Sequence, residues 1–241
     1  MKNRIIILVI GLVIGLSQIA FASFSGTPIS LNGNYGASWD HSELWSVLSS
    51  AGYTALAQDV YNDVSGLGTS GSYGVYKDTL WQAAHGYSAE IIAEVAGYKN
   101  NNRFGWYDGQ LSTEIFSGPD SISASANFNN ANSLGFWIDA NGSGNYYYTN
   151  TADNLNDNLQ AIVFDLSGYS QFGSQYYGYL ICFEDLSLSG NNDTDYQDMI
   201  VHLNPASPEP ASVSLLGLGL LGIGLLRGKR DNKINKTKEV K

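Results

Sequence analysis

Residues 175–205 read QYYGYLICFEDLSLSGNNDTDYQDMIVHLNP and contain two runs of alternating apolar side chains on either side of an acidic loop. Successive side chains of a β-strand point to opposite faces, so a period of two predicts a strand with one face in a core. His202 falls between the apolar positions and is expected to face solvent, whereas Cys182 is expected to be a small buried hydrophobe. The alternating positions are Tyr177, Tyr179, Ile181 and Phe183 in the first run, and Met199, Val201 and Leu203 in the second.

Other short segments also indicate strands. Alternation recurs in residues 88–98 and 133–138, Asn141-Gly142 is a hairpin signal, and residues 159–166 form a nearly continuous apolar run. The chain is also rich in Gly and Tyr, and polar turns separate the runs. These features predict a mainly β fold, an antiparallel β-sandwich that is jelly-roll-like, over residues 76–205.

One segment near the start has helical spacing instead. In residues 38–52, SWDHSELWSVLSSAG, the apolar side chains Leu44, Trp45 and Leu48 fall on one helical face, and Gly52 can end the helix. We expect one short helix there. Residues 23–75 are interpreted as this helix and a turn-rich linker, within the same domain as the sandwich.

The N-terminus has the layout of a secretory signal peptide. Lys2 and Arg4 precede an apolar run over residues 5–16, and the small-x-small triplet Ala20-Phe21-Ala22 follows. The run is shorter than the roughly 20 residues that a membrane span needs, so a retained membrane helix is the weaker alternative. Residues 1–22 are therefore predicted to be removed during export.

The C-terminal segment, residues 206–241, has three parts in a fixed order. Pro208-Glu209-Pro210 is followed by an uncharged run rich in Leu and Gly over residues 211–226, and then by a basic cluster that includes Arg227, Lys229 and Arg230. A basic tail behind a short apolar helix is held on the inner side of a membrane by the positive-inside rule. The bulk of the chain is then expected on the outer side.

This order resembles the PEP-CTERM sorting signal of bacterial exosortase substrates, although about 11 residues follow Arg230 here. The resemblance implies a transient inner-membrane tether in a Gram-negative-type bacterium. Processing by an exosortase near Pro208-Glu209-Pro210 would follow, and then transfer to the cell surface or extracellular matrix. A permanent C-terminal anchor is the plain alternative.

The predicted exported part is strongly acidic. Residues 23–210 keep three basic residues (Lys77, Lys99 and Arg103) and 20 acidic residues, a net charge of −17. Such a surface repels nucleic acid, which we exclude as a partner, and favours cations or neutral polar molecules. Cys182 is the single cysteine, so the domain has no internal disulfide and must rely on its core or on bound ions.

The acidic loop is the densest chemical signal, with carboxylates at Glu184, Asp185, Asp193, Asp195 and Asp198. These groups repel one another unless solvent or a cation separates them. Ca²⁺ takes about six to eight oxygen ligands in flexible geometry, which aspartates at alternate positions can supply. The same residues also form turns by bonding to their own backbone, and spacing alone leaves the two roles even.

The pattern FEDL, a Gly/Asn-rich loop and then DTDYQDM is similar to the signature that closes an uncharacterised bacterial domain family of the DUF4114 type. Residues 90–108 and 133–149 fall in the expected order upstream, and Gln197 stands where asparagine is commoner. Members occur in secreted and PEP-CTERM proteins, and their acidic signature is suspected to bind calcium. Carried over by position, the implied Ca²⁺ ligands are Glu184, Asp185, Asp193, Asp195 and Asp198.

No catalytic motif accompanies the three histidines, and no enzymatic activity is predicted. The resemblance implies a structural or adhesive protein of an exopolysaccharide or biofilm matrix. Carbohydrate binding through exposed rings at Trp106, Trp137 and Tyr147 is the first alternative, although such rings are more often core. A glycoside hydrolase is the second alternative, because a catalytic pair of acids is not excluded. Residues 139–144, DANGSG, are a weaker cation candidate, for which a turn is the simpler interpretation.

Overall fold

The computed structural model describes residues 23–31, 44–65, 67, 74–82, 86–95, 97–118, 120, 122–128, 133–173, 175–187 and 195–205. They all belong to one compact unit, Ala20–Ala206. The predicted signal peptide, the sorting tail and Asp193 lie outside the described residues. Among the helices that the structure describes, none is long and apolar enough to cross a membrane.

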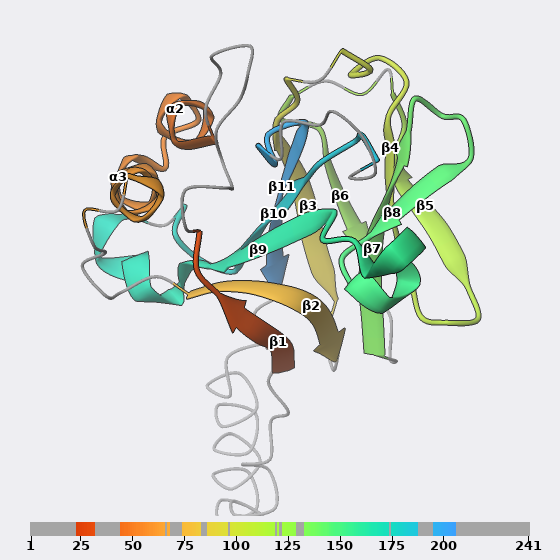
Figure 1. The fold of residues 1–241 in the computed structure, drawn as a ribbon, viewed down its shortest axis with the longest axis horizontal. Helices are drawn as coiled ribbons and strands as arrows, with labels where there is room; N and C mark the ends of the chain where they lie inside the picture. Colours follow the sequence, from red (N-terminus) through yellow and green to blue (C-terminus); the bar gives the residue numbers. More distant parts are fainter. Residues whose placement is uncertain are drawn as a thin grey trace, which may run out of the picture. The chain divides into compact units, whose positions relative to one another are not determined.

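The fold is mainly β and is built on one antiparallel sheet that is nearly closed into a barrel (Figure 1). The described residues form eleven strands in the order β5-β4-β7-β2-β9-β10-β11-β3-β6, with β1 beside β2 and β8 beside β7. The predicted mainly β, antiparallel class is therefore confirmed. The strands are β1 (Ser23–Ile29), β2 (Gly74–Gln82), β3 (Tyr87–Ala93), β4 (Arg103–Tyr107), β5 (Ser112–Phe116), β6 (Ser125–Phe128), β7 (Ser133–Ala140), β8 (Asn145–Tyr148), β9 (Ala161–Asp165), β10 (Tyr179–Phe183) and β11 (Met199–Pro205).

The inner face of the sheet encloses an apolar core, which the predicted alternating positions largely supply. β10 and β11 are antiparallel neighbours, and Ile181 lies opposite Val201 at the middle of the pair. Tyr177 precedes β10 and is exposed, so the alternation holds from Tyr179 onward. The predicted positions in or against this inner core are Tyr179, Ile181, Phe183, Met199, Val201, Leu203, Leu134, Phe136 and Ile138.

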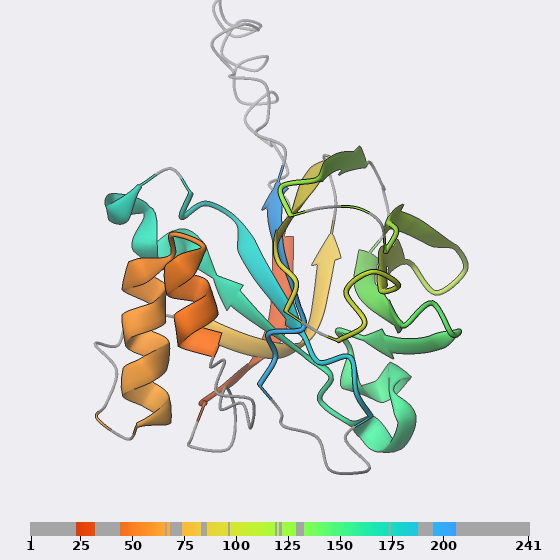
Figure 2. The same ribbon diagram turned by 90° about the horizontal axis from the view of Figure 1, so that it is seen from above.

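A second core lies on the outer face of the sheet, under the helices α2 (Leu44–Ser50) and α3 (Thr54–Val64) (Figure 2). Leu180 and Cys182 of β10 and Phe164 of β9 point into it. Because β9 is buried on both faces, its sequence is continuously apolar rather than alternating. Cys182 is fully buried, as predicted, and burial raises the pKa of its thiol.

The sequence predicted one helix in this layer, and the structure has two. α2 confirms the predicted helix, with Leu44 and Leu48 fully buried. α3 was missed, because its segment was assigned to the linker, although Leu56 and Val60 have helical spacing and face the same core. The short 3₁₀ helices η1 (Thr151–Asp153), η2 (Leu155–Asp157) and η3 (Leu166–Phe172) were not predicted either.

His202 does not face solvent, and that prediction was wrong. It is 5% exposed, with Nδ1 3.1 Å from the Tyr53 hydroxyl and Nε2 2.6 Å from the Tyr177 carbonyl oxygen. Because a carbonyl only accepts, Nε2 donates to it and Nδ1 accepts from Tyr53. Burial lowers the pKa of His202. Strand alternation correctly predicted that this residue faces away from the inner core, but it could not predict the helical layer that covers the other face of the sheet.

The predicted hairpin at Asn141-Gly142 is confirmed by the turn between β7 and β8. Asn141 and Gly142 have φ values of 59° and 58°, a left-handed conformation that these two residue types tolerate. Asp139 accepts a hydrogen bond from the Gly144 amide at 2.8 Å. This bond supports the turn interpretation of residues 139–144.

Candidate metal centre

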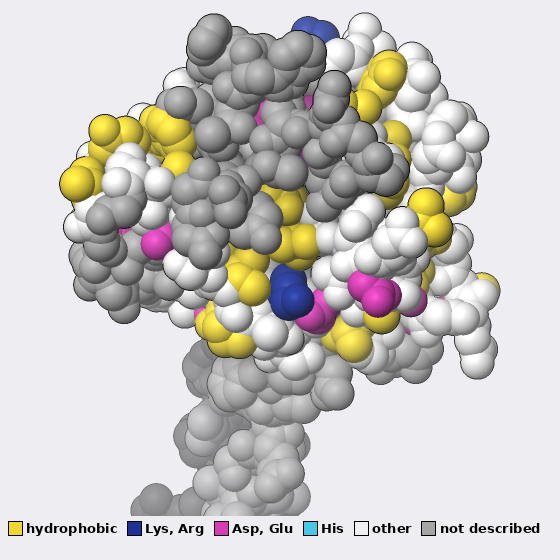
Figure 3. All heavy atoms as spheres, in the orientation of Figure 1, with side chains coloured by type: hydrophobic (Ala, Val, Ile, Leu, Met, Phe, Trp, Pro, Cys, Tyr) yellow, Lys and Arg dark blue, Asp and Glu magenta, His cyan; other side chains and the backbone are white. Residues whose placement is uncertain are grey.

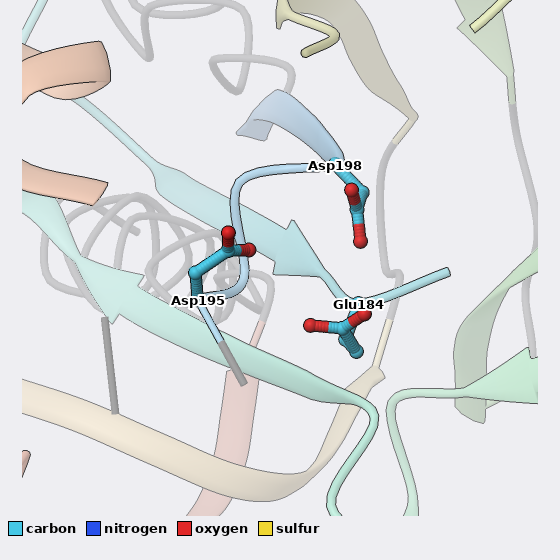
Figure 4. Close-up of side chains that lie close together, drawn as sticks. All are labelled: Glu184, Asp195 and Asp198. Carbon is cyan, nitrogen blue, oxygen red and sulfur yellow. The ribbon is translucent and has the colours of Figure 1, made fainter. Parts of the chain in front are cut away.

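Three carboxylates meet where β10 ends and β11 begins (Figure 4). Phe183 and Met199 are partners in the β10–β11 ladder. Glu184 follows the first of these residues and Asp198 precedes the second, so antiparallel pairing alone brings the two acids together. Asp195 approaches from the segment leading into β11, and one ligand oxygen of each of the three side chains lies within 4.8 Å of the others.

The polypeptide around Asp195 is held in an uncommon conformation. Tyr196 has a φ of 54°, which is rare for a bulky residue, and it is fully buried with its hydroxyl donating to the Leu159 carbonyl at 2.8 Å. Glu184 and Asp195 are 0% and 2% exposed, whereas Asp198 is half-buried. The anchored tyrosine thus helps to hold this segment against the end of β10.

Asp185, a predicted ligand, lies outside this group of three and supports it. Its backbone N–H donates to an Asp198 carboxylate oxygen at 2.8 Å, and its own carboxylate accepts from Asn102 Nδ2 at 2.9 Å. The Asn102 side-chain oxygen in turn accepts from the Asn141 amide at 2.8 Å. The site is therefore connected to the β7–β8 hairpin. Of the five predicted ligands, the structure brings together Glu184, Asp195 and Asp198, with Asp185 beside them.

Several polar residues around the site were not expected from the sequence. Glu94 is half-buried just after β3, and one of its carboxylate oxygens is buried without a hydrogen-bond partner. Gln160 is 1% exposed, and its Nε2 donates to the backbone oxygens of Glu184 and Leu186 at 3.2 and 2.8 Å. Gln160 directly precedes Ala161, the ladder partner of Phe183, so the β9–β10 pairing places it beside Glu184.

Burial places carboxyl groups of the same charge close together. Desolvation is the largest cause that raises the pKa of Asp198, and the nearby charges of Asp185 and Asp195 raise it further. Desolvation also raises the pKa of Glu94 to about 7. Protons can neutralise these acids at low pH, and a cation can do so at higher pH.

The aromatic residues proposed for sugar stacking are mostly internal. Trp106 is 8% exposed and lies in the inner core, and Trp137 is 4% exposed with its indole N–H donating to the Trp106 carbonyl at 3.1 Å. A Cβ at Gly105 would lie 2.2 Å from the Trp137 ring, so the missing side chain lets this ring lie on the sheet. Tyr147 is half-buried against the inner core. The burial of both tryptophan rings agrees with the core interpretation and not with the alternative of exposed stacking rings.

The chemistry of the cluster suits a hard cation. All three of its side chains offer carboxylate oxygens, which Ca²⁺ and Mg²⁺ prefer, whereas Zn²⁺ sites use mainly histidine and cysteine. Asp193 lies outside the described residues. No protein-family model, curated protein or solved structure was found to match the chain.

In the metal-free protein, Asp198→Asn is expected to increase the free energy of unfolding at pH 8 and to have little effect near pH 4. An acid whose pKa is raised by folding holds a proton that the unfolded chain has released. Wild-type stability therefore falls as pH rises from about 4 through the folded-state pKa. We expect a gain of about 1–2 kcal/mol at pH 8, since one pKa unit corresponds to about 1.4 kcal/mol and Asp198 is partly solvated.

Urea unfolding in EDTA at pH 4, 6 and 8 measures this difference. Asp157→Asn, at an exposed aspartate outside the cluster, is the matched control and should show no pH-dependent gain. Equal effects of Asp198→Asn at pH 4 and pH 8 would contradict the prediction.

Proposed function

We propose that this chain is an exported, non-catalytic protein of the cell surface or extracellular matrix whose fold is stabilised by Ca²⁺. The proposal rests on one observation, the convergence of Glu184, Asp195 and Asp198 within 4.8 Å at the junction of two central strands. Their burial favours a structural role over glycoside hydrolysis, because Glu184 is 0% and Asp195 is 2% exposed. A polysaccharide chain cannot reach carboxylates that are closed to solvent.

A cation here would join parts of the chain that the sequence separates. It would link the end of β10 to the segment before β11, and the hydrogen bonds through Asp185 and Asn102 would extend its effect to the β7–β8 hairpin. A ligand that binds only the folded state stabilises it by RT ln(1 + [L]/Kd). Extracellular calcium modules bind with Kd values of about 10⁻⁴–10⁻³ M, which suits a protein outside the cell.

The cellular part of the proposal comes from the two ends of the sequence. The signal peptide would export the chain, and the PEP-CTERM-like tail would hold it at the inner membrane until an exosortase processes it. The exported region has a net charge of −17, which keeps copies apart until divalent ions neutralise them. This property fits a component of an exopolysaccharide or biofilm matrix.

We further infer that the nearly closed sheet is a variant of a jelly-roll-like sandwich. Apolar side chains of β4 and β7 and those of β10 and β11 share the inner core, as the two facing sheets of a sandwich do. The helices α2 and α3 then form an added layer on one outer face.

Calcium is expected to raise the melting temperature of the full-length exported chain, purified in a mild detergent, and Mg²⁺ to raise it less. At a concentration 100 times Kd, bound Ca²⁺ adds about 2.7 kcal/mol, or about 5–10 °C for a domain of this size. Asp195→Asn removes one of the converging charges and should abolish most of the rise, whereas Asp157→Asn should retain it. No calcium-specific rise in the wild-type protein would refute the metal centre.

The sorting proposal predicts that replacing Pro208-Glu209-Pro210 with Ala-Ala-Ala leaves the protein in the membrane fraction of the producing cells. The wild-type chain should instead appear at the cell surface or in the medium as a shorter product. Fractionation followed by mass spectrometry of the C-terminus measures both outcomes. Unchanged release of the variant would argue against exosortase processing.

Carbohydrate binding is a second candidate function, favoured by a groove of about 450 Å³ between α2 and α3. Trp45 and Tyr61 meet there edge to face with ring centroids 5.4 Å apart, and Tyr61 is 40% exposed. The rest of the lining is Ala57 together with hydroxyl and amide side chains, such as Ser49 and Gln58, and it carries no charge. Figure 3 shows hydrophobic side chains gathered on the side of the molecule where these helices lie. An aromatic pair flanked by neutral polar groups suits an uncharged saccharide.

Tyr61→Ala is expected to weaken binding of cellotetraose or maltotetraose about tenfold, the equivalent of about 1.4 kcal/mol, because the sugar loses a stacking ring. Tyr146→Ala is the matched control, since Tyr146 is 43% exposed but lies on β8, away from the groove. Calorimetric titration and saturation-transfer NMR measure binding. Loss of binding in the Tyr146 variant alone would move the site to the β7–β8 hairpin, and no binding by the wild-type chain would remove this candidate.

A further inference from the structure

Gln197 is a buried polar side chain whose carbonyl oxygen has no hydrogen-bond partner. The residue is 2% exposed, and its Oε1 is fully buried without a donor nearby. An unsatisfied buried acceptor is unfavourable, so folded proteins rarely retain one unless another group or an ion binds it. In the sequence, Gln197 was noted only as a departure from the family pattern and was not among the predicted ligands.

The end of the Gln197 side chain lies beside the carboxylate cluster. Its Nε2 donates to Asp195 Oδ2 at 2.6 Å, and its backbone N–H donates to Asp195 Oδ1 at 3.2 Å. The amide nitrogen and oxygen share one carbon atom, so Oε1 lies at most about 5 Å from that Asp195 oxygen. Asp195 is itself one of the three converging acids. The orphan oxygen therefore lies close to one of the three converging acids.

We propose that Gln197 Oε1 is a fourth protein ligand of the cation, and that this neutral ligand favours Ca²⁺ over Mg²⁺. The inference rests on the calcium site proposed above and identifies a further ligand and the ion preference of that site. Gln197 has two roles in this arrangement. Its backbone N–H and its Nε2–H hold the Asp195 carboxylate, while its side-chain oxygen binds the ion.

The ion preference follows from the number and type of oxygens. Ca²⁺ accepts six to eight ligands in irregular geometry and readily includes amide oxygens. Mg²⁺ requires near-ideal octahedral geometry, keeps several waters and usually takes only one or two carboxylates. Three carboxylates and one amide oxygen from chain segments that meet at two strand ends suit the larger ion.

The test uses the full-length exported chain and three variants. Gln197→Met keeps the size of the side chain and removes both the oxygen and the Nε2–H donor to Asp195. Gln197→Glu also removes this donor but keeps an oxygen at the same position, and Gln171→Met changes an exposed glutamine of η3 as a control. Calorimetric titration with Ca²⁺ and with Mg²⁺ gives the affinity of each ion. The luminescence lifetime of bound Tb³⁺ in H₂O and in D₂O counts the waters on the ion.

Gln197→Met is expected to weaken Ca²⁺ binding about tenfold or more, to affect Mg²⁺ much less, and to add about one water to bound Tb³⁺. Gln197→Glu should bind Ca²⁺ at least as tightly as wild type with no added water, and Gln171→Met should match wild type. A purely structural role for Gln197 would lower stability without changing the water count.

Different results would contradict the proposed calcium site and the assignment of Gln197 as a ligand. No Ca²⁺ binding by the wild-type protein would overturn the metal centre and this inference together. Wild-type Ca²⁺ binding, with the same affinity and water count in Gln197→Met, would overturn the ligand assignment alone. If Gln197→Met does not fold, Gln197→Glu decides the matter, since loss of Ca²⁺ binding in that variant would overturn the assignment.

Discussion

The antiparallel pairing of β10 with β11 is the contact on which the rest of the structure depends. Its odd-numbered side chains enter the inner core, while Leu180, Cys182 and Ile200 enter the core beneath the helices. A shift of one residue would exchange these two sets and turn His202 into the inner core, so the hydrophobic effect fixes the register strongly. The same register places Glu184 beside Asp198. The position of the candidate metal centre is thus a direct consequence of how the two cores are filled.

This placement brings an electrostatic cost, which the surrounding polypeptide is built to limit. The backbone N–H of Asp185 and both N–H groups of Gln197 donate to carboxylates of the cluster, and such bonds stabilise the ionised form. Tyr196 holds the segment in a left-handed conformation that would be unfavourable by itself. Donors alone do not offset desolvation at Asp198, whose pKa is still raised. Under the proposal made above, a divalent cation would add positive charge beside these carboxylates.

The sequence predicted the features that depend on local backbone geometry. It did not predict the features that depend on contacts between distant segments. Alternation in β10 and β11 identified the inner-core side chains, and Asn141-Gly142 identified a hairpin, because both signals depend on local backbone geometry. Outward-facing residues were harder to place. His202 was assigned to solvent because strand periodicity does not report what covers the other face of a sheet. Trp106 and Trp137 were considered for a surface role because residue type does not show that Gly105 leaves room for a ring on the sheet.

The residues around the candidate site also fall into two groups, those that the sequence identified and those that only the folded structure reveals. Acidic residues close to β10 and β11 were found from composition, whereas Glu94, Asn102 and Gln160 come from distant segments that the sheet order brings together. Their contribution depends on pairings such as Ile200 with Ala93 and Phe183 with Ala161, which no single segment encodes. Gln197 is the instructive case, because a neutral residue among aspartates contributes nothing to a charge pattern. Its importance arises only when burial leaves its oxygen without a hydrogen-bond donor. The domain has a single cysteine, so a cation bound by that oxygen and the neighbouring acids would link chain segments where no disulfide can.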